Sequence, residues 1–333
     1  MGIARGIFMV HTGGGGGADG GKKLLYHMDK YGVDACVLKT GANGKNDPNI
    51  ELVKQHPDRF VAICNDVETH RRAVAGEKPW NVEDSVKELD ELLATGQFVG
   101  IGEGLPRDRT FRKKTVTWEE RLDQICQLFE LGRKYKITMA IHTGMPIAGF
   151  SILDLARART QTHMADNGNP LLVHEIAALY PDVSILLIHA GVEASGYFME
   201  DYEKCLNVAA SHNNVFLETG MWWSELYMKP LKDPNIGAKK LVWGTGWGQP
   251  NVYQTWMPGE IPETYNAINL DEGYPKYQPD IFGWSLRELG KLNIPQDDLN
   301  LILGGNAALL YKVPTPFPYE SMFKTVDRRF WND

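Results

Sequence analysis

The sequence predicts an α/β fold, and a (β/α)8 TIM barrel is the architecture that accommodates it best. Eight short apolar runs alternate with amphipathic segments along the 333 residues. Each run is bounded by polar residues or glycine, which is typical of buried parallel strands. The composition, 43% hydrophobic and 23% charged, is that of a globular protein with a sizeable core.

We expect strands at residues 7–10, 35–38, 60–64, 98–101, 139–141, 185–188, 215–217 and 241–243. A doubly wound open sheet is the alternative arrangement of these elements. That fold usually carries a glycine-rich turn between its first strand and a helix. The glycine tract at residues 13–17 lacks the context of a GxGxxG motif, in which an acidic residue follows a second strand about 20 positions on, so we discount a dinucleotide site.

Capping signals predict where several helices begin. Asn81 can cap one helix, Thr117 with Glu120 forms a capping box for a second, and Asn169 followed by Pro170 predicts the start of a third. A last helical stretch covers residues 298–311, with a break at residues 304–305. The first helix carries one apolar stripe, formed by Val82, Val86, Leu89, Leu92 and Leu93. The second is expected to face inward with Leu122, Ile125, Cys126 and Phe129, and the third includes the apolar residues Ile176, Ala177 and Leu179.

The composition also excludes several classes of protein. A net charge of −7 without any basic run argues against a nucleic-acid partner. No apolar run approaches the roughly 18 residues of a membrane span, and the first residues lack the pattern of a secretory signal. The four cysteines are far apart and form no CxxC pair, so we expect buried thiols in a cytoplasmic protein.

No linker divides the chain, and we expect one domain over residues 1–333. Residues 247–284 are rich in Trp, Tyr and Pro and are interpreted as an insertion, and residues 313–333 form a proline-punctuated tail. Aromatic residues at this density line a pocket, build an interface between subunits, or simply cover the barrel. We expect a homo-oligomer, or a hetero-oligomer with a homologous subunit.

Four candidate metal ligands lie where strands of the predicted barrel end. These are His11 after the first strand, Glu103 after the fourth, His142 after the fifth and His189 after the sixth. Reactive groups of a barrel gather at the carboxyl ends of its strands. Imidazole nitrogens with a carboxylate oxygen suit Zn²⁺, Mn²⁺ or Fe²⁺, so we predict one divalent metal ion, with zinc ahead of manganese and iron.

Further residues are candidates for contacting the substrate. Arg107 and Arg109 follow the fourth strand and could bind a carboxylate, although a solvated basic loop is the simpler interpretation. His163 follows the fifth strand on the same side of the barrel. Glu193 and Glu218 lie near the ends of the sixth and seventh strands, where a structural role is favoured. Four other histidines are expected at the surface: His27, His56, His70 and His212.

Several segments together resemble the amidohydrolase superfamily, in particular the amidohydrolase-2 branch that includes metal-dependent aromatic-acid and carboxymuconate-semialdehyde decarboxylases. They are residues 24–34 (LLYHMDKYGVD), 51–60 (ELVKQHPDRF), 180–191 (YPDVSILLIHAG), 240–246 (KLVWGTG) and 303–306 (LGGN). The resemblance implies a barrel of the amidohydrolase type with a metal at its mouth. His142 matches the family's strand-five metal histidine, and His189 matches the strand-six histidine, which binds metal or acts as acid and base. Glu103 lies near the strand-four position, where some relatives use a ligating group.

Two departures from this family stand out. The first strand of the family ends in His-x-His, whereas here His11 is followed by Gly13 at the place of the second histidine; the motif is either lost or lies upstream. The family's strand eight ends in Gly-Ser/Thr-Asp, and that aspartate is replaced here by Gly246. Glycine supplies neither a ligand nor a base.

From these residues we expect a metal-dependent decarboxylase or hydrolase acting on a small carboxylic acid, with His189 and Glu103 as catalytic residues. A degenerate subunit that supports an active homologous partner is the alternative, because two anchors of the usual site are missing. A non-haem metal oxygenase is a second alternative, since a His/Glu site would also accept iron or manganese.

Overall fold

The computed structural model describes residues 7–9, 21–39, 46–104, 110–111, 117–144, 161–162, 168–192, 199–220, 222–245 and 281–312. The chain divides into two compact units. The first consists of Met1–Lys39, Asp47–Val61 and Glu218–Asp333, and the second of Thr40–Asn46 and Ala62–Leu217. Each unit is described by itself below, and strands β3 and β9 each run from one unit into the other.

The second unit is built on parallel strands that alternate with helices. Each described pair of neighbours, β3 with β4, β4 with β6, β6 with β8 and β8 with β9, is parallel. A short antiparallel pair, β5 with β7, accompanies them. The strands are β3 (Phe60–Cys64), β4 (Phe98–Gly104), β5 (Thr110–Phe111), β6 (Thr138–His142), β7 (Gln161–Thr162), β8 (Ile185–Ile188) and β9 (Val215–Glu218).

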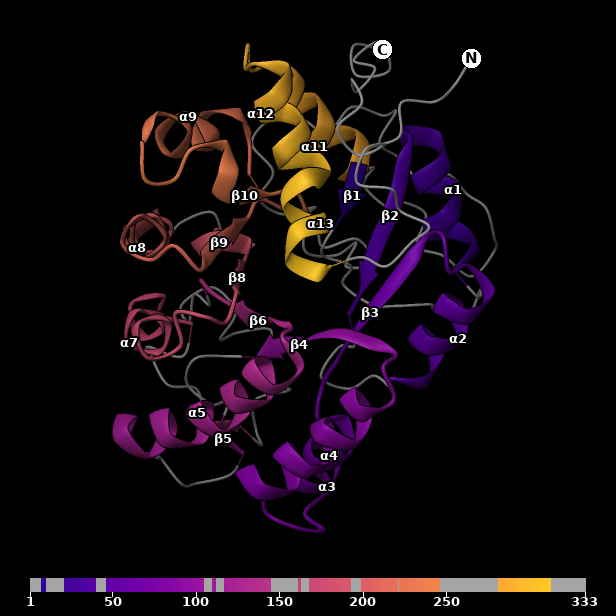
Figure 1. The fold of residues 1–333 in the computed structure, drawn as a ribbon, viewed down its shortest axis with the longest axis vertical. Helices are drawn as coiled ribbons and strands as arrows, with labels where there is room; N and C mark the ends of the chain where they lie inside the picture. Colours follow the sequence, from indigo (N-terminus) through magenta and orange to yellow (C-terminus); the bar gives the residue numbers. More distant parts are fainter. Residues whose placement is uncertain are drawn as a thin grey trace. The chain divides into compact units, whose positions relative to one another are not determined.

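Helices of the second unit cover its strands. They are α3 (Val67–Ala75), α4 (Val82–Ala94), α5 (Trp118–Tyr135), α7 (Leu171–Leu179) and α8 (Met199–Ser211). In Figure 1, α5, α7 and α8 lie on one side of strands β4, β6 and β8. All four residues of β8 and the first four of β6 are buried, because strands of a parallel sheet are covered on both faces.

Two of the predicted caps are confirmed. The Asn81 side chain accepts a hydrogen bond from the Asp84 amide at 2.8 Å and starts α4. Thr117 and Glu120 form the expected capping box of α5, with N···O distances of 3.2 and 3.1 Å. Local sequence therefore fixes where these helices begin.

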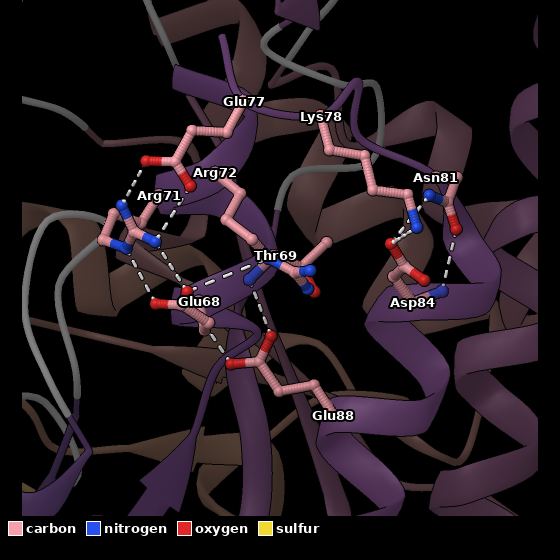
Figure 2. Close-up of polar contacts among 9 residues, drawn as sticks. All are labelled: Glu68, Thr69, Arg71, Arg72, Glu77, Lys78, Asn81, Asp84 and Glu88. Carbon is pink, nitrogen blue, oxygen red and sulfur yellow. Dashed lines mark hydrogen bonds and ion pairs between the residues drawn. The ribbon is translucent and has the colours of Figure 1, made fainter. Parts of the chain in front are cut away.

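Helix α3 is capped by a residue of the following helix. The carboxylate of Asp66, the residue before α3, accepts bonds from the Trp80 indole and the Ser85 hydroxyl at 3.0 and 2.6 Å. Glu88 of α4 instead accepts the α3 amides of Glu68 and Thr69, at 2.8 and 2.7 Å. Figure 2 shows this carboxylate directed at the two amides. The cap thus ties α3 to α4.

The first unit contains a parallel pair, β1 (Ile7–Met9) and β2 (Val33–Leu38), with Ile7 opposite Val33. It also contains β10 (Leu241–Val242), whose Val242 carbonyl accepts the Thr219 amide at 3.0 Å. Its helices are α1 (Lys22–Tyr31), α2 (Asp47–Gln55), α9 (Ser224–Lys232), α11 (Ile281–Gly290), α12 (Gln296–Asn300) and α13 (Asn306–Tyr311).

The predicted break at residues 304–305 is a π-helical segment, Leu301–Gly305, between α12 and α13. The Ile302 carbonyl accepts the Trp243 amide at 2.9 Å, and the Trp243 indole donates to Ser285 of α11 at 2.8 Å. The Asn306 amide side chain donates to the Ala238 and Leu241 carbonyls, both at 2.7 Å. The widened turn is therefore tied on both sides to the segment around β10.

All eight predicted strands are confirmed, with ends that shift by at most a few residues. Several finer expectations are wrong. His27 was expected at the surface but is 7% exposed, since its ring lies edge-on to Phe282. Val86, Leu92, Leu122 and Cys126 are half-buried rather than buried.

The hydrogen bond expected of the third predicted cap is present. Asn169 accepts the Leu171 amide at 3.1 Å, and Pro170 has helical backbone angles, although the regular helix begins at Leu171. The described elements are those of an α/β fold with parallel strands, and closure into a complete barrel stays a prediction. None of the helices within the described residues is long and apolar enough to cross a membrane.

Candidate functional site

The second unit brings two predicted site residues together. His142 is the last residue of β6, and His189 directly follows β8. The two strands are parallel neighbours with His142 opposite Ile188, so their carboxyl ends present both histidines at one edge. The ring centroids are 4.8 Å apart and the ring planes are inclined at 71°. The structure therefore places these two predicted residues side by side.

Both rings are largely withdrawn from water. His189 is 3% exposed and His142 is half-buried, and Nδ1 of each ring is buried. Burial in a medium of low polarity strengthens any interaction that a ring nitrogen makes with a cation. The arrangement is that of a recessed pair of nitrogen donors rather than of two surface side chains.

The backbone that carries His189 is unusual. His189, Ala190 and Gly191 form a left-handed turn, with φ angles of 64°, 43° and 78°. Left-handed backbone costs a residue with a side chain roughly 1–2 kcal/mol. Two such residues in a row therefore mark a turn that its surroundings hold in place, and strain of this kind clusters at functional sites.

Glycines allow the loops after β6 and β8 to approach closely. Gly144 has a φ of 78°, and a Cβ atom there would lie 2.7 Å from the backbone of Gly191. A Cβ atom on Gly191 would lie 2.3 Å from the backbone of Asp201 and Tyr202 in α8. The segment that follows His142 and the turn that holds His189 are thus packed backbone against backbone.

The backbone of Glu103 lies at the same edge of the second unit, where β4 and β6 end. It lies in β4 next to Gly104, which is opposite Ile141 of β6, one residue before His142. The strand order thus brings the backbone of this predicted ligand beside the histidine strand, while its side chain lies outside the described part of the structure.

The remaining predicted residues lie outside the described residues: His11, Arg107, Arg109, His163 and Glu193. Gly246, which replaces the family's aspartate, lies outside them as well. Within the described ranges, no group of three or more His, Cys, Asp or Glu side chains is placed to hold a metal ion. The four-residue ligand set therefore stays a prediction. The structure describes the side chains of two of its members, His142 and His189.

The first unit contains a buried carboxylate at a strand end. Glu218 is the last residue of β9 and is fully buried. A Cβ atom added to Gly220 or Gly244 would lie 2.2 or 2.1 Å from its Oε1 atom, so both glycines leave room for the carboxylate. The sequence favoured a structural role for Glu218. Its strand-end position was visible in the sequence, but the two glycines that accommodate it were not.

The ionisable groups around these positions are held neutral by burial. Burial raises the pKa of the Cys205 thiol, which donates a hydrogen bond to Thr143 at 3.5 Å. Burial and the nearby Glu218 also raise the pKa of Tyr227, whose hydroxyl donates to Thr219 at 2.9 Å. Neither group is a nucleophile at neutral pH.

The histidine pair fits a bound divalent metal. Two imidazoles on one tetrahedral Zn²⁺, each about 2.0–2.1 Å from it, bring their ring centres to about 5 Å. The observed 4.8 Å agrees with that arrangement. Imidazole nitrogen is also a suitable donor for Mn²⁺ and Fe²⁺. His142 and His189 could therefore serve as two ligands of a site that other residues complete.

Parallel strands alternating with helices, and a histidine pair at adjacent strand ends, define an α/β protein with a candidate metal centre. A family model described as amidohydrolase matches residues 38–313, which is most of the chain. The protein therefore belongs to the amidohydrolase family, as the resemblance in the sequence predicted. No curated protein matches the sequence.

Two solved structures are similar to this chain. An amidohydrolase from Burkholderia multivorans, solved with bound zinc, covers 93% of this chain and 100% of its own, with a TM-score of 0.53 and 11% identity. A TatD family hydrolase from Entamoeba histolytica covers 97% of each chain at 12% identity, with a TM-score of 0.46. At 11% identity the first similarity bears on the fold alone.

Proposed function

We propose that the protein is a metal-dependent enzyme that acts on a small carboxylic acid, with decarboxylation ahead of hydrolysis. Membership of the amidohydrolase family suggests metal-dependent, hydrolase-like chemistry. The observation that carries the proposal is the pair of recessed imidazoles, His142 and His189, 4.8 Å apart at the ends of neighbouring strands. A recessed pair of nitrogen donors is a site for a cation with open coordination positions.

Each residue has a proposed role. His142 is a metal ligand, and His189 is either a second ligand or the group that transfers a proton. His11 and Glu103 complete the ligand set, and Glu103 is a further candidate for acid–base work. A divalent metal bound there would polarise the substrate's carboxylate or lower the pKa of a bound water to about 7. Zinc is proposed ahead of manganese and iron.

The substrate is recognised by its carboxylate. Arg107 and Arg109 are proposed to bind a carboxylate through paired N–H donors, and His163 to contact the rest of the molecule. In decarboxylation the bond to the carboxylate carbon breaks, CO₂ leaves, and the electron pair stays on the substrate carbon. A proton from His189 or Glu103 replaces the CO₂, and that group is reprotonated from water.

A supporting subunit is the second candidate. Gly13 and Gly246 stand where the family places a histidine and an aspartate, so this chain lacks two usual anchors. In that case the chain would keep the fold and assist a homologous, active partner. The two candidates differ in whether the purified chain binds metal and turns over alone.

Metal content tests the proposal first. Elemental mass spectrometry should find about one equivalent of divalent metal in the purified chain, and less than a third of that in His142→Ala and in His189→Ala. His56→Ala is the matched control, because its ring is also half-buried and lies edge-on to Phe60. Full metal content in His142→Ala would show that the site is assigned wrongly.

Activity then separates the two candidates. The metal-loaded chain is offered a panel of small aromatic and aliphatic carboxylic acids, with released CO₂ measured directly, and a matched panel of their esters and amides. CO₂ release that His142→Ala abolishes supports the decarboxylase, and cleavage of the esters or amides alone supports a hydrolase. Turnover that requires a co-expressed homologue would instead favour the second candidate, in which this chain assists an active partner.

A further inference from the structure

Thr143 links the segments that carry the two histidines of the candidate metal site. It directly follows His142 and is fully buried. Its hydroxyl donates to the Ile188 carbonyl at 2.9 Å and accepts the Gly191 amide at 3.0 Å. It also accepts the thiol of Cys205 from α8 at 3.5 Å. A hydroxyl has one donor and two acceptor positions, so its full capacity is used.

The two backbone groups that Thr143 contacts flank His189. Ile188 precedes the left-handed turn, and Gly191 is its last residue. In an ordinary β-turn the carbonyl of the first residue accepts the amide of the fourth directly. Here the Thr143 hydroxyl bonds both that carbonyl and that amide, and the Thr143 backbone amide donates to the same carbonyl at 3.2 Å. The turn is thereby braced from outside by the residue that follows His142.

The energies involved are of similar size. Left-handed backbone at His189 and Ala190 costs roughly 1–2 kcal/mol for each residue. Each hydrogen bond to the hydroxyl contributes about 0.5–1.5 kcal/mol, and a buried backbone group that loses its partner costs about 1–3 kcal/mol. The Ile188 carbonyl keeps the Thr143 backbone amide at 3.2 Å, so the buried Gly191 amide is the group that loses its acceptor when the hydroxyl is removed. The turn is therefore expected to shift at Gly191, and the His189 ring would move with it.

We infer that the Thr143 hydroxyl is a positioning group that holds His189 in the orientation which lets it share a metal ion with His142. This inference rests on the proposed function, since it assigns the residue that preorganises that site. Thr143 acts through the backbone on either side of His189. Groups that orient metal ligands in this way typically change metal affinity by 10–100-fold when they are removed.

Two substitutions at one position test the inference. Thr143→Val keeps the shape and removes the hydroxyl, whereas Thr143→Ser keeps the hydroxyl and removes the methyl group. We expect Thr143→Val to weaken Zn²⁺ binding about 10–100-fold and to change the visible absorption of the Co²⁺-loaded protein. Thr143→Ser should stay within about threefold of the wild type, with an unaltered Co²⁺ spectrum.

Thr138→Val is the matched control, because Thr138 is also buried and begins the same strand. It should leave the Zn²⁺ affinity and the Co²⁺ spectrum unchanged. Cys205→Ala removes only the weakest of the three contacts to the hydroxyl and should have a small effect. A loss in Thr143→Ser as large as in Thr143→Val would overturn the inference, even if the valine variant folds poorly.

Hydrogen exchange provides a readout that needs no metal. In the metal-free wild type, the amide of Gly191 should be protected, and Thr143→Val should remove this protection while Thr143→Ser retains it. Unchanged protection in Thr143→Val would show that the hydroxyl does not hold the turn. If the wild type binds metal through His142 but Thr143→Val matches it in affinity and spectrum, only the inference fails. If the wild type binds no metal, the proposed function fails.

Discussion

At the scale of single residues, the position of His189 depends on backbone conformations that its own sequence does not favour. His189 and Ala190 carry side chains in left-handed conformation, and only the third residue of the turn is glycine. Gly191 is needed for a second reason, because the backbone of α8 lies where its Cβ atom would be. Conformation and close approach are thus separate demands on this residue.

These two demands can be separated with a matched pair of substitutions. Gly96 also has a left-handed φ, of 69°, but no atom lies within 4 Å of the Cβ that it lacks. Gly96→Ala should therefore cost only the left-handed conformation, about 1–2 kcal/mol. Gly191→Ala should lower the free energy of unfolding by at least about 2 kcal/mol more, because the α8 backbone must move. Urea unfolding of both variants measures the difference, and equal losses would contradict the close packing.

At the scale of elements, helix starts in the second unit follow two different rules. The caps of α4 and α5 come from neighbouring residues and could be predicted from the sequence. The cap of α3 comes from Glu88, some 20 residues further on, and no local pattern announces it. Around it, Figure 2 shows Arg71 between Glu68 and Glu77. These ion pairs are exposed and add little stability.

The cap from α4 is therefore expected to dominate the stability of this helix pair. Glu88→Ala should lower the free energy of unfolding by about 1–2 kcal/mol, because two α3 amides lose a charged acceptor. Glu91→Ala is the control, since Glu91 is exposed on the same helix, 4.0 Å from Lys87. It should change stability by less than about 0.5 kcal/mol. Chemical unfolding measures both variants. Equal losses in the free energy of unfolding would show that the cap is wrongly assigned.

At the scale of the whole molecule, the sequence predicts the strands better than the site. A buried parallel strand is a local apolar run, so all eight were found from the residues alone, and the histidines at two strand ends followed. The left-handed turn of His189 could not be found, because it depends on Thr143, 46 positions earlier in the chain. The same holds for Glu88, and for Gly244 beside Glu218: contacts between distant residues leave no periodic signal.

A buried lysine links the stability of the whole molecule to pH. Lys240 ends the short turn Ala238–Lys240 before β10 and is 4% exposed. Burial, with a smaller contribution from Lys239, lowers its pKa to about 8. An unfolded lysine has a pKa of about 10.4. Between these values the unfolded chain binds more protons at this residue, so its contribution to stability rises with pH; below about pH 8 the buried charge is a cost.

Lys240→Met should therefore stabilise the protein most at neutral pH. At pH 7 the gain in the free energy of unfolding should reach up to about 3 kcal/mol, and it should fade between about pH 8 and pH 10.5 as the wild-type lysine loses its proton. Buried thiols such as Cys64, whose pKa burial raises to about 12, titrate alike in both proteins and cancel in the comparison. Lys239→Met, at the exposed neighbour, should show a much smaller gain, because Lys239 makes only the smaller contribution to the lowered pKa of Lys240. Urea unfolding at pH 7, 9 and 10.5 measures all three proteins, and a gain that does not change with pH would show that Lys240 is not a desolvated charge.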